Sequence, residues 1–249
     1  MRFHWLLPTI KGIPVLMYHR IWPGQRDGLT LTPEQLREQW LWLKEQGYRA
    51  LSMQEFLAIT TGKTPLPGKC VLLTFDDGYH NNLTHVYPLL QELDWCATLF
   101  IIADTLDGTA TKPDLEIDRK LTVDELRRMD RKYIQLGLHG YHHENFSKCT
   151  AEEIRQIMEH SYQAFKDQGI IFEPVLAYPY GARPKDNHVL QQMKQQLQAS
   201  GLQAAFRIGN KPERIPSADR LVIKRIDIRG EDTLADFKIK LRKGKLKPF

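Results

Sequence analysis

An α/β fold is predicted by three features of the sequence: short apolar runs, helix-start signals between them, and the regular alternation of the two. Eight runs are apolar on both faces, as parallel strands are when helices cover the sheet. They lie at residues 13–17, 48–51, 71–75, 97–102, 134–138, 174–177, 203–206 and 221–226. Seven or eight strands alternating with helices predict either a closed barrel or an open doubly wound sheet.

Four of the predicted helices begin with a capping box. In this motif a Thr or Ser side chain accepts a hydrogen bond from the third helical amide, and a Gln or Glu at that position reaches back. The pairs are Thr32 with Gln35, Ser52 with Glu55, Thr122 with Glu125, and Thr150 with Glu153. Pro33 suits a first helical position. These signals fix where the segments between the apolar runs turn helical.

The composition is that of an ordinary globular chain. Of 249 residues, 42% are hydrophobic, 26% charged and 10% aromatic, which argues against disorder. Because α/β barrels reach this length as single units, we expect one domain over residues 1–249. It carries a polar insertion at 104–120, typical of a functional lid or a disordered loop, and a basic tail at 238–249.

A cytoplasmic location is predicted by what the sequence lacks. No apolar run approaches the roughly 20 residues that span a bilayer, and the apolar patch at 5–7 is too short for a signal peptide. The three cysteines form no C-x-x-C pair, which excludes a disulfide framework and a Cys-rich zinc site. No glycine-rich phosphate-binding motif follows any strand, so a nucleotide-binding fold is not indicated.

The basic tail accounts for part of the formal net charge of +5. Six Lys and Arg residues lie within residues 238–247, which fits a solvated helix face with a frayed end. The alternative is peripheral contact with an anionic membrane surface or an anionic glycolipid. Nucleic acid is not expected as a partner, because no aromatic residues alternate with these cations.

Polar side chains follow four of the apolar runs directly. His19 follows the first run, Asp76 and Asp77 follow the run at 71–75, and His139 follows the run at 134–138. The sequence Y-P-Y-G at 178–181 follows the run at 174–177. In a parallel barrel all these positions meet at the C-terminal face, where barrel enzymes hold their active sites.

A metal site is indicated by Asp77, His139 and His143. Two imidazoles and one carboxylate, with the remaining positions left to water, are typical of a catalytic divalent site. The donor set suits one Zn²⁺, although Co²⁺, Ni²⁺ or Fe²⁺ would also be accepted. The alternative is a solvated polar loop that contains His139, His142 and His143. We expect His142 to face away from the metal.

Asp76 and Asp77 are informative because they are adjacent. Neighbouring side chains at a strand end point in different directions, so one carboxylate can bind the metal while the other accepts a proton from the metal-bound water. Gly78 permits the sharp turn that leaves both facing a cleft. The alternative is that Asp77 or Asn81 caps the next helix, which explains one aspartate and not two.

Three stretches resemble motifs of the polysaccharide deacetylases, the NodB-homology enzymes of carbohydrate esterase family 4. They are T-F-D-D-G at 74–78, H-G-Y-H-H at 139–143 and Y-P-Y-G at 178–181. The resemblance covers most of the chain and implies a distorted (β/α)7 barrel that removes acetyl groups, mostly N-acetyl, from glycans with one divalent metal.

The resemblance also implies residue roles. Asp76 would be the catalytic base, and Asp77, His139 and His143 the metal ligands. The backbone amide of Tyr180 would stabilise the oxyanion. Its neighbours in the motif would contact substrate; these are Tyr178, Pro179 and Gly181.

The chain departs from the family pattern at two points. Ala177 stands where the family commonly has an Arg that tethers the catalytic aspartate, and no late L-x-H motif supplies a general acid. The opening P-V-L-M-Y-H-R at 14–20 resembles the branch that acts on poly-N-acetylglucosamine. We therefore expect His19 to be the general acid, the alternative being a buried core histidine, and Arg225 to replace the tethering cation.

Together these features predict a metal-dependent deacetylase acting on an N-acetylated sugar. With no export signal recognised, a nucleotide- or lipid-linked precursor of a surface glycan at the inner membrane face is the expected substrate. One alternative is a deformylase or another small-amide C–N hydrolase. The other is a glycan-binding module that has lost catalysis, which the departures at Ala177 and the late motif favour.

Overall fold

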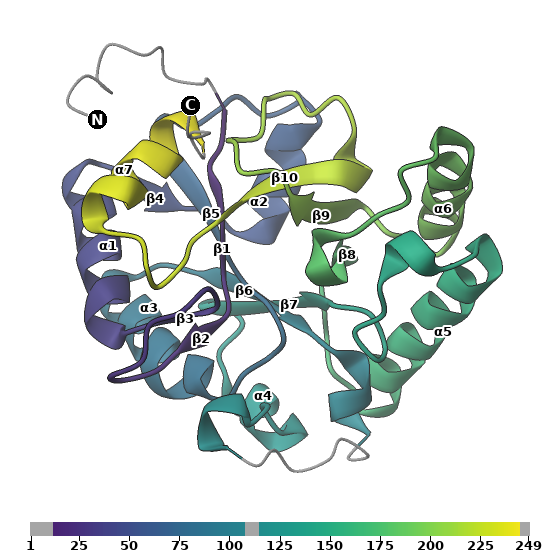
Figure 1. Ribbon diagram of the computed structural model, residues 1–249, viewed down its shortest axis with the longest axis horizontal. Coiled ribbons are helices and arrows are strands. Elements are labelled where there is room, and N and C mark those ends of the chain that lie inside the picture. Colours follow the sequence, from purple (N-terminus) through teal and green to yellow (C-terminus); the bar gives the residue numbers. More distant parts are fainter. Residues whose placement is uncertain (1–11, 108–114, 245–249) are drawn as a thin grey trace.

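The protein forms a closed barrel of parallel strands in a computed structural model that describes residues 12–107 and 115–244 (Figure 1). The strands are β1 (Val15–Tyr18), β5 (Cys70–Phe75), β6 (Ala97–Ile101), β7 (Ile134–Leu138), β8 (Val175–Ala177), β9 (Ala204–Ile208) and β10 (Ile223–Asp227). The ring closes because β1 pairs with both β10 and β5. All neighbours are parallel, which confirms the predicted (β/α)7 barrel and excludes the open sheet.

Three further strands lie outside the ring. The short β4 (Arg49–Ala50) pairs with the beginning of β5. Two strands that the sequence did not predict, β2 (Arg20–Ile21) and β3 (Thr30–Leu31), pair with each other after β1. They are too short to carry an alternation of polar and apolar residues that could be recognised.

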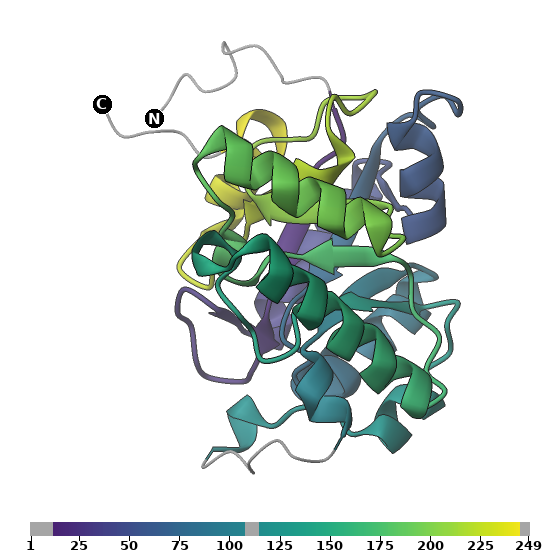
Figure 2. The ribbon, with the colours of Figure 1, turned by 90° about the vertical axis from the view of Figure 1, so that its right-hand side faces the viewer.

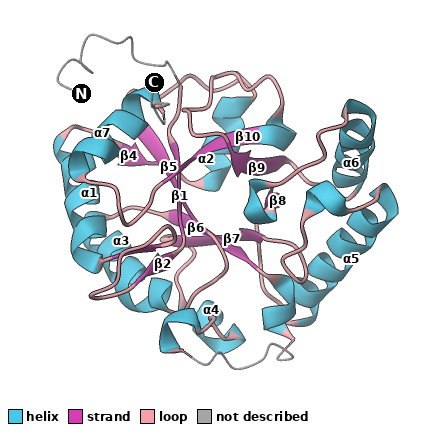
Figure 3. Ribbon diagram, viewed as in Figure 1, coloured by secondary structure: helices cyan, strands magenta, loops and turns pink. Residues whose placement is uncertain are grey.

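Helices surround the strands on all sides (Figure 3). They are α1 (Pro33–Glu45), α2 (Met53–Thr60), α3 (Tyr87–Leu93), α4 (Val123–Arg128), α5 (Ala151–Asp167), α6 (Asn187–Ala199) and α7 (Leu234–Lys243). Figure 2 shows α5 and α6 side by side on one flank of the barrel. All four predicted capping boxes are confirmed, and a fifth, which the sequence analysis missed, begins α7.

The buried side chains form two clusters because successive residues of a strand face opposite sides. One cluster fills the space between strands and helices. The other fills the barrel and includes Phe100 and Phe206, whose ring centroids lie 5.5 Å apart. Phe56 of α2 packs on Phe206, and the Met53 amide donates to Gln135 at the start of β7. Helix α2 therefore covers the barrel end opposite the predicted site.

The predicted insertion and tail are described in part. The insertion contributes two short turns, Ala103–Leu106 and Glu116–Asp118, and residues 108–114 lie outside the described ranges. In the tail, Lys240 and Lys243 are buried, so a uniformly solvated helix face is wrong for these two lysines. Residues 1–11, which include the patch at 5–7, and 245–249 are also outside the description. Among the helices that are described, none has the length and apolar character needed to cross a bilayer.

Candidate metal centre and active site

Seven of the ten predicted site residues line one cavity at the ends of the barrel strands, and Arg225, Tyr178 and Pro179 do not. His19 follows β1, Asp76 and Asp77 follow β5, His139 follows β7, and Tyr180 lies in the turn after β8. The cavity has a volume of about 400 Å³. Its other lining residues come mainly from the chain after β2 and from the ends of β9 and β10; they are Met17, Gly28, Leu29, His143, Gly181, Ile208, Asp227 and Arg229.

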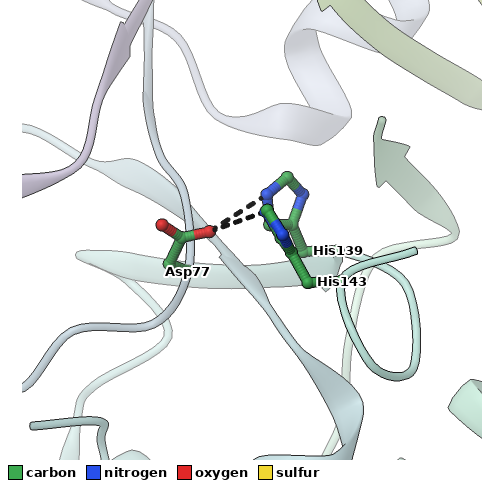
Figure 4. A group of neighbouring side chains, drawn as sticks. All are labelled: Asp77, His139 and His143. Carbon is green, nitrogen blue, oxygen red and sulfur yellow. Dashed lines mark ion pairs between the residues drawn. The ribbon is translucent and has the colours of Figure 1, made fainter. Parts of the chain in front are cut away.

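Asp77, His139 and His143 point toward one another (Figure 4). The Asp77 Oδ1 atom lies 3.2 Å from Nε2 of His139 and 3.4 Å from Nε2 of His143. One potential ligand atom from each residue falls within 4.8 Å of the others. Asp77 Oδ1 is buried and has no hydrogen-bond partner among residues 12–107 and 115–244. A buried, unsatisfied carboxylate oxygen between two imidazole nitrogens fits a divalent cation.

A backbone hydrogen bond orients the first imidazole. His139 Nδ1 lies 2.8 Å from the carbonyl oxygen of Ala177. Because a carbonyl only accepts, Nδ1 carries the proton, and the lone pair of Nε2 faces Asp77. Ala177, which stands where the family commonly has an arginine, thus orients His139 through its backbone carbonyl.

Backbone strain is concentrated at the site. Five non-glycine residues in the described ranges have positive φ, and Asp77, His143 and Tyr180 are three of them. Gly78 also has positive φ, and a Cβ there would lie 2.9 Å from the Ile101 side chain. Positive φ is costly for side chains other than glycine and is commonly retained where it aims functional groups. The turn after β5 is therefore shaped for the site.

Asp76 is held by Arg225 of β10. Arg225 Nη1 and Nη2 lie 2.6 and 2.7 Å from the two carboxylate oxygens, and both side chains are buried. Burial alone would raise the pKa of Asp76, but the charges of Arg225 and His139 outweigh it and hold the pKa below its usual value. Asp76 is therefore an ionised carboxylate beside the candidate metal ligands.

His19 lies at the edge of the same cavity. Its Nε2 atom is 3.9 Å from Asp76 Oδ2, and its side chain is 12% exposed. Its Nδ1 atom is buried and finds no partner among the described residues. Burial lowers the pKa of His19, and the opposing charges of Asp76 and Asp77 do not fully offset it. His19 therefore does not match the alternative of a core histidine whose ring nitrogens are hydrogen-bonded.

Two predicted substrate contacts are wrong. Tyr178 is completely buried, donates its hydroxyl to the Leu221 carbonyl at 2.8 Å, and packs on Phe146. Pro179 is buried and does not line the cavity. Both contribute to the core because the chain turns sharply after β8. Gly181 does line the cavity.

Tyr180 and His142 lie at the surface around the site. Tyr180 is 65% exposed, and its ring centroid lies 4.5 Å from that of His143. His142 faces away from the ligands, as expected, and its Nδ1 lies 2.8 Å from Asp104 Oδ2.

Sequence reasoning missed several residues near the cavity. Tyr79 lies beside Asp77, and burial together with the Asp77 charge raises its pKa. Lys120 Nζ lies 3.4 Å from the Tyr79 ring centroid, and burial lowers its pKa to about 8. Asp227 is the last residue of β10, and Arg229 lies two residues after it. The rule that found Asp76 and His139, a polar residue after a buried apolar run, would also have found them.

Comparisons with known proteins agree with the motifs. A polysaccharide deacetylase family model matches residues 63–201, more than half of the chain. YxkH, a Bacillus subtilis protein named for the same family, is 29% identical over 170 residues, which is 68% of this chain and 57% of that protein. The poly-beta-1,6-N-acetyl-D-glucosamine N-deacetylase of Escherichia coli K12 is 31% identical over 140 residues, covering 53% of this chain and 21% of the enzyme. The chain thus spans little more than half of one relative and about a fifth of the other.

Solved structures share the fold. The deacetylase PplD of Streptococcus pyogenes superposes with a TM-score of 0.75 at 22% identity, covering 94% of this chain and 99% of that one. IcaB from Ammonifex degensii gives a TM-score of 0.71 at 22% identity, covering 92% and 96%. The family model, the three motifs and the barrel agree, and the chain belongs to the polysaccharide deacetylase family.

Proposed function

We propose that this protein is a metal-dependent hydrolase that removes N-acetyl groups from an N-acetylated sugar, and that residues 1–249 form one catalytic domain. The observation that carries the proposal is the meeting of Asp77, His139 and His143 with the ionised Asp76 in one cavity. The printed activity of the Escherichia coli relative, N-deacetylation of poly-beta-1,6-N-acetyl-D-glucosamine, supports the reaction class.

Asp77, His139 and His143 would hold one divalent cation. Two imidazole nitrogens and one carboxylate oxygen suit Zn²⁺, with Ni²⁺, Co²⁺ and Fe²⁺ as the other candidates. When bound, such a cation lowers the pKa of a water and polarises the acetyl carbonyl.

Asp76 acts as the base. Its carboxylate accepts a proton from the water whose oxygen attacks the acetyl carbon. Arg225 holds that carboxylate through both oxygens, so the base stays ionised and oriented. The backbone N–H of Tyr180 donates to the acetyl oxygen as negative charge develops on it.

His19 acts as the general acid. Its Nε2 faces the cavity near Asp76 and delivers a proton to the sugar nitrogen as the C–N bond breaks. The products are acetate and a free amine. Because the pKa of His19 is lowered, the neutral imidazole is the main form near neutral pH, and His19 must take up a proton before it can donate one.

The substrate is proposed to be a glycan or glycolipid precursor, met in the cytoplasm at the inner membrane face. Exposed Arg242 and partly exposed Lys238 are the described tail cations left to contact anionic lipid. The double variant K238Q/R242Q tests this contact with vesicles that contain phosphatidylglycerol. If the double variant bound these vesicles as well as the unsubstituted protein does, the proposed membrane contact would be wrong.

The other readings predict different products. A deformylase would release formate, and a glycan-binding module would release nothing. The buried Asp76–Arg225 pair argues against the module, because binding alone needs no ionised base beside metal ligands. The test is elemental analysis of the purified protein, combined with measurement of acetate and formate released from N-acetylglucosamine oligomers. We expect one metal per chain and acetate; formate alone, or neither product, would overturn the proposal.

A further inference from the structure

Arg229 places a positive charge at the mouth of the cavity. It lies two residues after the end of β10 and lines the cavity with Gly28 and Leu29, which come from the loop between β2 and β3. Its side chain is 42% exposed, so the guanidinium is open to a ligand. Nothing in the hydrolytic reaction described above uses it.

The terminal nitrogens of Arg229 have no partner among the residues that the structure describes. Its Nε lies 3.5 Å from Glu231 Oε2, an exposed pair of the kind that contributes little. Neighbouring cations are engaged instead. Arg225 binds Asp76, Arg20 binds Asp118 at 2.6 Å, and Lys240 binds Asp232.

Gly28 makes room for this guanidinium. A Cβ at Gly28 would lie 2.5 Å from Arg229 Nη2, although Gly28 is not in the left-handed region and its backbone does not require glycine. The two segments are joined by hydrogen bonds, from Arg26 Nε to the Gly230 carbonyl and from the Gly230 amide to the Asp27 carbonyl, both at 2.8 Å. The guanidinium therefore lies over a fixed backbone surface at the cavity mouth.

The carboxylates that line the cavity do not bind Arg229. Asp76 is bound by Arg225, and Asp77 lies between two imidazoles. The Arg229 charge acts on Asp227, but no hydrogen bond or ion pair joins these two side chains. The terminal nitrogens of Arg229 thus remain a forked donor, a geometry that matches the oxygens of a phosphate or a carboxylate.

We propose that Arg229 binds an oxyanion, a phosphate or carboxylate carried by the substrate next to its N-acetyl sugar. The substrate is then an acidic sugar derivative rather than a neutral polymer. This inference rests on the proposed function, which supplies the N-acetylated sugar. Binding of the anionic group by Arg229 can be measured separately from the hydrolysis.

The experiment compares three sugars. N-acetylglucosamine 1-phosphate carries a phosphate, N-acetylmuramic acid a carboxylate, and methyl N-acetylglucosaminide no charge. Acetate release gives kcat and KM for each. Calorimetry with the deacetylated forms, glucosamine 1-phosphate, muramic acid and methyl glucosaminide, measures binding without turnover. We expect one of the anionic sugars to be preferred by roughly tenfold or more, mainly through KM.

Arg229→Gln should abolish that preference, and Arg229→Lys should retain part of it, because lysine keeps the charge and loses the fork. Arg37→Gln is the matched control, since it removes one positive charge from a half-exposed arginine paired with Glu92 away from the cavity. Equal binding of anionic and neutral sugars by the unsubstituted protein would overturn the inference. So would an equal loss of preference in the Arg37 control. An anion preference in calorimetry without acetate release would instead retain the Arg229 site and reject the proposed function.

Discussion

Arg225 binds both carboxylate oxygens of Asp76 across the interior of the barrel, although 149 residues separate the two in sequence. The guanidinium comes from β10, whereas the family commonly supplies a tethering arginine at the position of Ala177, on β8. Strands of one closed barrel converge at their ends, so a cation from another strand can reach the same carboxylate.

Removing this cation should destabilise the protein and reduce activity together. Arg225→Gln leaves a buried carboxylate unpaired, which costs about 3–5 kcal/mol. Urea unfolding measures the free-energy change, and acetate release measures the activity. The double variant Asp76→Asn/Arg225→Met should recover much of the stability without activity. Recovery of turnover in the double variant would remove Asp76 from the base role.

Asp76→Asn should abolish acetate release while the metal content stays near one per chain. The amide cannot accept the proton from water, and the three candidate ligands are untouched. Mass spectrometry and the acetate assay measure the two effects. Asp104→Asn is a suitable control, because Asp104 pairs with His142 and does not line the cavity. Full acetate release by Asp76→Asn would contradict the assignment.

His139→Ala should lose the metal. An ion that binds only the folded protein raises the unfolding midpoint, so added Zn²⁺ should raise the midpoint of the unsubstituted protein. In His139→Ala only two of the three candidate ligands remain, and the rise should disappear. His142→Ala provides the control, since this imidazole is exposed and bonded to Asp104. A zinc-dependent rise retained by His139→Ala and lost by His142→Ala would reverse the ligand assignment.

His19→Ala should slow acetate release by roughly 10²–10⁴-fold without releasing the metal, because it removes a proton donor and no ligand. The effect should shrink for an acetyl ester of an acidic phenol, whose leaving group needs no proton. A rate unchanged on N-acetylated sugars would show that His19 has no part in the reaction.

His19 should also make stability depend on pH. Its pKa in the folded protein is below the ordinary 6.5, so near that pH the unfolded chain binds more protons than the native protein. The contribution is fully present above about pH 6.5 and is lost as pH falls toward the lower folded pKa. The free energy of unfolding should therefore fall more steeply below pH 6.5 for the unsubstituted protein than for His19→Gln. Parallel curves would contradict the lowered pKa.

Local signals account for what could be predicted. The eight apolar runs all became strands, and the capping boxes placed the helix starts, because both depend on residues a few positions apart. The candidate metal ligands Asp77, His139 and His143 could be predicted for a related reason. Each residue directly follows or lies near a strand end, and parallel strands bring such positions together. The same rule failed at Tyr178 and Pro179, where the sharp turn after β8 directs the side chains into the core.

The sequence alone determined the alternation of strands and helices, the donor atoms of the candidate metal site and the carboxylate beside them. The family resemblance predicted the closed ring and Arg225 as the tether of Asp76, but only the tertiary structure shows the pairing that closes the ring and the contact that Arg225 makes. The position of Arg229 over Gly28 at the cavity mouth could not be predicted from the sequence. The physical reason is the distance along the sequence over which each interaction acts. Capping and strand formation are decided by neighbours in the chain, whereas the partner of a buried charge depends on which distant segment the closed barrel brings to it.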